Sequence, residues 1–128
     1  MTPAEITIAF IEDYKKWNDY AFQQSRENKN NHDQNIKNAY QELIFKFCSK
    51  NKKYQPLAYG SKSNHCPDQE YIVSESIVGE TAVIKTKFQD KKYDFISNEF
   101  EYIFAVESGK WILEEVFLVD KTGKYKGL

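Results

Sequence analysis

The chain has 128 residues, a length typical of one domain, and we treat residues 1–128 as a single domain. It carries 18 Lys and Arg against 19 Asp and Glu, and a net charge of −1 excludes a protein built to neutralise phosphates. Its two cysteines make no disulfide framework, we expect no signal peptide, and no apolar run approaches the ~20 residues that span a bilayer. We therefore expect a cytoplasmic protein that binds neither nucleic acid nor membrane.

Two amphipathic helices are predicted first, over about residues 3–50. Thr2-Pro3-Ala4-Glu5 is typical of a helix start, because Thr2 can cap, Pro3 fits the first turn and Glu5 can close a capping box. Apolar residues then recur every three or four positions in two stripes: Ile6, Phe10, Tyr14, Trp17 and Ala21, then Ile36, Tyr40, Leu43 and Phe47. Residues 51–69 follow as an irregular connector that contains two prolines and a glycine.

After residue 70 the apolar period becomes two, which predicts an antiparallel sheet over residues 70–119 and a short tail over 120–128. Two hairpins are indicated, one turning at Gly79-Glu80 and the other at Ser108-Gly109. Helices followed by an antiparallel meander predict an α+β fold in which the helices pack on a curved sheet and form a cone.

The two-residue turns also predict which side chains share a face of the sheet. On the inner face, toward the helices, Phe104 would lie opposite Leu113, Tyr102 opposite Glu115, Glu75 opposite Ile84 and Val73 opposite Thr86. The outer face would have an apolar centre of Ile103, Ala105, Ile112, Val116 and Leu118, flanked by Glu99, Glu101, Glu107 and Glu114. Such a face is typical of a protein-binding site, unless the tail or an irregular segment covers it.

No nucleophile elbow, phosphate loop or metal-binding motif occurs, and we expect no metal and no cofactor. The two inward acids, Glu75 and Glu115, could act with Tyr102 in a minimal proton-transfer site. The alternative for these acids is a structural carboxylate hydrogen-bonded to a tyrosine. His32 and His65 lie in polar segments, and we expect both to be exposed.

Three stretches resemble a known family. They are the opening helix with Phe10 and Trp17, the run Cys66-Pro67-Asp68-Gln69-Glu70-Tyr71, and the run from Gly109-Lys110-Trp111 to Gly123-Lys124-Tyr125. With the order of elements, they are similar to the nuclear-transport-factor-2-like (cystatin-like) fold. Within that fold the chain resembles the immunity proteins of bacterial polymorphic toxin systems.

The resemblance implies an immunity protein without catalysis, which binds and neutralises the toxin domain encoded beside it. That toxin would be delivered by contact or by secretion, including type VI secretion, and the immunity protein would block its active site or substrate surface. The residues that we expect to bind it are Glu99, Glu101, Ile103, Ile112, Glu114 and Val116, followed by Asp68 and Glu70 at the start of the first strand.

Two alternatives remain open. The first is a small isomerase or dehydratase of the same cone-shaped fold, which would use Glu75 or Glu115 with Tyr102. The second is a homodimer formed through the sheet face.

Overall fold

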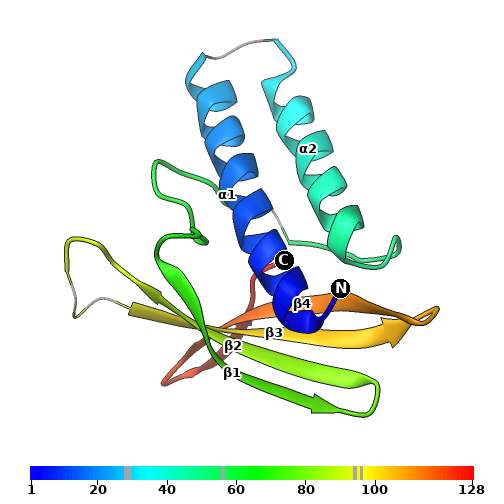
Figure 1. Cartoon of the computed structure of the whole chain (residues 1–128). Coiled ribbons are helices and arrows are strands. Elements are labelled where there is room, and N and C mark those ends of the chain that lie inside the picture. The colour runs from blue at the N-terminus through cyan, green and yellow to red at the C-terminus, as the bar shows by residue number, and fades with distance from the viewer. Residues whose placement is uncertain (28–29, 56, 94, 96) are drawn as a thin grey trace.

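The computed structural model describes residues 1–27, 30–55, 57–93, 95 and 97–128. Two helices, α1 (Pro3–Glu27) and α2 (His32–Phe47), come before a five-stranded antiparallel sheet in the order β1-β2-β3-β4-β5. The strands are β1 (Glu70–Val78), β2 (Thr81–Gln89), β3 (Ser97–Glu107), β4 (Lys110–Asp120) and β5 (Gly123–Lys126). Both helices lie on the same side of the curved sheet (Figure 1). This arrangement confirms the predicted α+β fold of helices packed on a curved antiparallel sheet.

The predicted capping box is present at the start of α1. The amide of Thr2 donates to Glu5 Oε1 at 2.9 Å, and the amide of Glu5 donates to Thr2 Oγ1 at 3.2 Å. The apolar stripe behind it is buried at every predicted position, namely Ile6, Phe10, Tyr14, Trp17 and Ala21. The side chains of this stripe, with those of α2, cover the inner face of the sheet and form the core.

One buried asparagine fixes the connector between α2 and β1. The Asn18 side chain donates to the Gly60 carbonyl at 2.9 Å and accepts from the Gly60 amide at 3.1 Å. Asn18 is 1% exposed, so these bonds are shielded from water. They hold the middle of the connector against α1, which sets the position of the residues that lead into β1.

Near both turns the pairing confirms the predicted register, with Glu75 opposite Ile84 and Phe104 opposite Leu113. A β-bulge then interrupts each hairpin, because Val73 in β1 and Glu114 in β4 have no partner residue across the ladder. Beyond the bulges the predicted pairs are wrong by one residue. Tyr102 lies opposite Val116 rather than Glu115, and Thr86 lies opposite Ile72 rather than Val73.

The sheet also continues beyond residue 119, where the sequence predicted its end. Asp120 Oδ1 accepts from the amides of Thr122 at 2.7 Å and Gly123 at 3.2 Å, which closes a turn into β5. β5 then pairs with the end of β4. The tail therefore widens the sheet, and the last residue, Leu128, is buried in the core rather than lying over the outer face.

Candidate functional site

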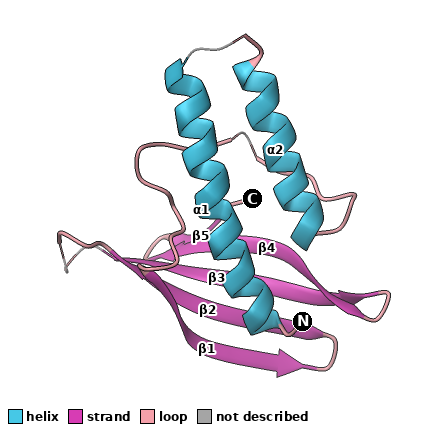
Figure 2. Ribbon diagram, turned by 45° about the horizontal axis from the view of Figure 1, so that its top comes forward, coloured by secondary structure: helices cyan, strands magenta, loops and turns pink. Residues whose placement is uncertain are grey.

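No helix covers the outer face of the sheet in the part of the chain that the structure describes (Figure 2). Near the hairpin turns this face carries partly exposed apolar side chains, which we call the apolar patch: Val83, Ile103, Ala105 and Ile112. Toward the other end of the strands it carries charged side chains, which we call the charged band: Lys85, Lys87, Glu99, Glu101, Lys124 and Lys126. A partner would therefore meet an apolar area beside a charged one.

Val116 does not belong to this face, and its predicted placement there was wrong. It is fully buried opposite Tyr102, on the side of the helices. The bulge at Glu114 adds one residue to β4 and so reverses the alternation of all later side chains. Phe117 and Val119 consequently take outward positions, opposite Glu101 and Glu99.

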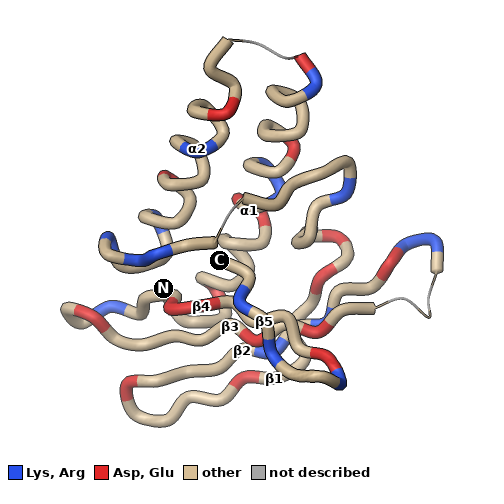
Figure 3. The backbone as a smooth tube through the Cα atoms, turned by 180° about the vertical axis from the view of Figure 1, so that it is seen from behind, with Lys and Arg blue, Asp and Glu red and all other residues tan. Residues whose placement is uncertain are grey.

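The acids on the outer face differ in their partners. Glu101 is shared by two lysines, with Lys124 Nζ 2.6 Å from Oε2 and Lys85 Nζ 3.8 Å from Oε1. Glu99 and Glu114 are exposed and form no ion pair within the described residues. Figure 3 shows acidic and basic positions interspersed along these strands. Two carboxylates of the predicted rim are thus free to meet a partner, whereas Glu101 already has its counter-ions.

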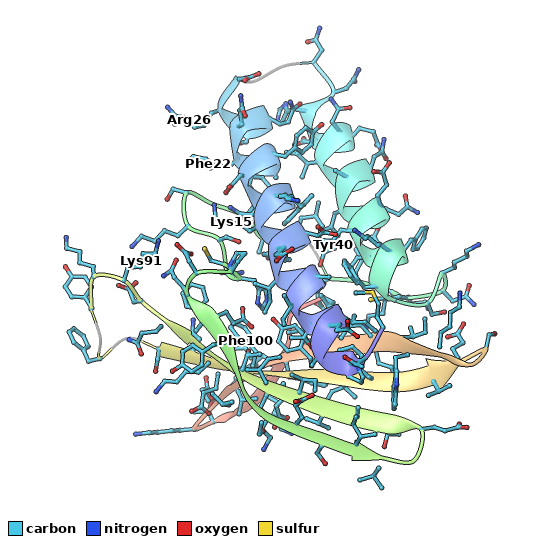
Figure 4. The ribbon with its side chains drawn as sticks, in the orientation of Figure 1. Lys15, Phe22, Arg26, Tyr40, Lys91 and Phe100 are labelled. Carbon is cyan, nitrogen blue, oxygen red and sulfur yellow. The ribbon has the colours of Figure 1, made fainter. Side chains whose placement is uncertain are left out.

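Asp68 is exposed just before β1. Its Oδ1 accepts from the Cys66 thiol at 2.7 Å and its Oδ2 pairs with Lys91, and together they lower the pKa of Asp68 to about 2. Asp68 and Lys91 line a hollow of about 710 Å³, and Lys15 of α1 borders the same hollow. Lys15 and Lys91 point to the same side of the molecule (Figure 4). Asp68 therefore lies in a hollow far along β1 from the apolar patch.

Glu70, by contrast, has no accessible side-chain surface. Its Oε2 accepts from the hydroxyls of Tyr102 at 2.5 Å and Thr86 at 2.6 Å, and its Oε1 lies 2.7 Å from His65 Nδ1. We call these four residues the buried polar cluster. The prediction that His65 is exposed was wrong, since the residue is 3% exposed and packs against Phe100. No pattern in the sequence indicates that the connector folds this histidine inward.

The cluster contains an acid hydrogen-bonded to Tyr102, but the acid is Glu70 rather than Glu75 or Glu115. Burial, and then the nearby Glu70 carboxylate, raise the pKa of Tyr102 well above its ordinary value. Both side chains are enclosed, with Tyr102 fully buried, so a substrate has no room at this pair. Its geometry is that of a hydrogen-bonded core network.

The two acids of the enzyme alternative lie elsewhere. Glu75 is exposed on β1, because the helices do not extend over that end of the strand. Glu115 is buried and bonds Lys52 of the connector at 2.8 Å, while its other oxygen accepts from the amide of Leu128 at 3.0 Å. Glu115 therefore ties the connector and the chain end to β4, and it does not meet Tyr102.

No group of three or more His, Cys, Asp or Glu side chains among the described residues could hold a metal ion. Among the same residues, no helix combines the length and apolar character needed to cross a membrane.

An antiparallel sheet with two helices on one face and a partly apolar face that no described helix covers defines an α+β protein of the cone-shaped fold. The comparisons narrow this class, because residues 2–126 match the family model of the NTF2 fold immunity proteins. The chain belongs to this family of immunity proteins. No curated protein and no solved structure matches it.

Proposed function

We propose that this chain neutralises the toxin domain encoded beside it by binding that domain with the outer face of its sheet. The observation that carries the proposal is the uncovered apolar patch, where Val83, Ile103, Ala105 and Ile112 adjoin one another across three strands. The family supplies the kind of partner, since an immunity protein acts on a toxin. The partner is thus a protein, and the chain itself acts by binding rather than by catalysis.

The apolar patch supports a stable contact because it is contiguous and lies on the rigid part of the sheet. β2 pairs with β3 without a break, and β3 pairs with β4 on both sides of the bulge at Glu114, so the ladder holds the backbone on which these side chains stand. A small apolar centre that a partner fully desolvates supplies most of the binding energy in typical interfaces. Ile103 on β3 and Ile112 on β4 are the two isoleucines of the apolar patch, and we expect them to be its main contacts.

The charged side chains beside the apolar patch would set the orientation of the bound partner. Glu114 follows Ile112 on β4, Glu99 lies in the charged band on β3, and both are exposed. A toxin that acts on an anionic substrate holds it with Lys and Arg side chains, which these carboxylates would pair with. Glu101, already held by Lys85 and Lys124, keeps the charged band in a fixed arrangement. Covering the basic residues of the toxin would exclude its substrate.

Binding of the purified toxin domain by single variants tests this proposal. We expect Ile112→Asp to weaken binding by roughly 100-fold and Glu114→Lys by roughly tenfold or more, because each would be central to the contact. Glu12→Lys is the matched control, since Glu12 is an exposed acid on α1, on the other side of the sheet. If both outer-face variants bind and protect like the unmodified chain, the toxin does not bind this face.

A further inference from the structure

The first strand of the sheet has an exposed edge that is unusually apolar. β1 lies at the end of the strand order and pairs only with β2. Four of its apolar side chains are exposed, at 50% for Tyr71, 54% for Val73, 54% for Ile77 and 72% for Val78. Edge strands are usually protected against pairing by charged side chains, by proline, by a β-bulge or by short length. β1 has nine residues and contains neither lysine nor proline, and its bulge at Val73 lies before the segment from Ser74 to Val78.

The backbone of β1 offers hydrogen bonds at this edge. The carbonyl of Glu80 accepts from the Val106 amide, so even-numbered residues of β2 bond β3 and its odd-numbered residues bond β1. In the register of the first hairpin, Ser76 and Val78 then bond β2, whereas the N–H and C=O groups of Glu75 and Ile77 point away from the sheet. These are the groups that a further strand would use.

The charge of the edge indicates what that strand carries. Glu75 is exposed in the middle of β1 and Glu80 is exposed at its turn, while β1 itself has no basic residue. A second copy of the chain, paired antiparallel about Glu75, would bring two Glu75 carboxylates together, and like charges at such a position are destabilising. A strand with Lys or Arg opposite Glu75 would instead be attracted.

We propose that a strand of the toxin domain adds to β1, through apolar side chains that alternate with polar ones and a basic residue opposite Glu75. This inference rests on the proposed function. Val78 lies in the same row of outward residues as Thr81, Ala105 and Ile112, so an added strand would lie beside the end of the sheet that carries the apolar patch. The toxin domain would then hold both the outer face and its open edge.

The test compares two substitutions at Ile77 in binding to the purified toxin domain. Ile77→Pro removes an N–H that points to solvent, so the β1–β2 ladder keeps its bonds, but a partner strand cannot pair there. Ile77→Ala keeps the N–H and removes most of the same side chain. Strand addition predicts that the proline variant binds roughly tenfold or more weakly than the alanine variant. Equal affinities would overturn the inference.

If the proline variant does not fold, hydrogen exchange in the unmodified chain tests strand addition instead. In the unmodified chain, hydrogen exchange at the amides of Glu75 and Ile77 should slow at least tenfold when the toxin domain is bound. Unchanged exchange at both amides would overturn strand addition. If Ile112→Asp abolishes binding while Ile77→Pro does not, the proposed function stands and the inference fails. If the unmodified chain does not bind the toxin domain, both fail.

Discussion

At the scale of single residues, the buried polar cluster explains why a carboxylate is stable inside the cone. Glu70 has three partners for its two oxygens, from His65, Thr86 and Tyr102. A buried acid without such partners would be strongly destabilising. The cluster joins the connector to β1, β2 and β3, so it closes one end of the core with hydrogen bonds in place of apolar packing.

Removal of one hydroxyl tests this role. Tyr102→Phe should lower the free energy of unfolding by about 1–3 kcal/mol, because Glu70 Oε2 loses one of its two hydrogen-bond donors in the core. Tyr71→Phe is the control. The Tyr71 side chain is half exposed, so removing its hydroxyl should change the free energy of unfolding by no more than about 0.5 kcal/mol. Urea denaturation of both variants measures the difference. Equal stabilities would show that the hydroxyl of Tyr102 contributes nothing.

The cysteines give a second prediction at this scale. Burial raises the pKa of Cys48 to about 12, and burial also raises the pKa of Cys66. At pH 8 roughly one Cys48 thiol in ten thousand would be a thiolate, which is the reactive form. We expect neither thiol to react with a disulfide reagent within minutes in the folded protein, and both to react in urea. Rapid reaction of one equivalent in the folded protein would contradict this account.

At the scale of elements, the turns set the register and the bulges modify it. Both turns could be placed from the sequence, because Gly79 and Gly109 supply the positive φ angles, 60° and 76°, that two-residue hairpins need. Pairs close to the turns were therefore predicted correctly. The bulges at Val73 and Glu114 were not predicted from the sequence. A bulge accommodates the curvature of the sheet over the helices, and it has no sequence signature here.

The Ser108-Gly109 turn can be used to test whether the positive φ of its glycine stabilises the fold. Gly109→Ala should lower the free energy of unfolding by roughly 1–2 kcal/mol, because φ is positive there even though nothing lies within 4 Å of an added Cβ. Gly60→Ala is the matched control, since an added Cβ there would have its nearest contact at 3.9 Å and the backbone is unstrained. A loss at Gly60 as large as that at Gly109 would mean that the turn conformation does not determine the cost.

At the scale of the whole molecule, the two faces of the sheet differ, and in the proposed function one face would hold the core while the other would bind the toxin. One side of the sheet is covered by α1 and α2 and holds the core, while the other side carries the apolar patch and the charged band. The sequence predicted this division from the alternation along β3 and β4. It misplaced Val116 because one extra residue inverts a strand, and it missed the burial of His65 because that depends on a contact from the connector to β3.

Titration of isotope-labelled methyl groups with the purified toxin domain shows which face of the chain binds it. We expect the Ile and Val methyl resonances of Val83, Ile103 and Ile112 to shift or broaden as the toxin domain is added. The methyl groups of Ile8, which is half exposed on α1, should not change. Shifts at Ile8 with none at Ile103 and Ile112 would place the toxin on the helices and contradict binding by the outer face.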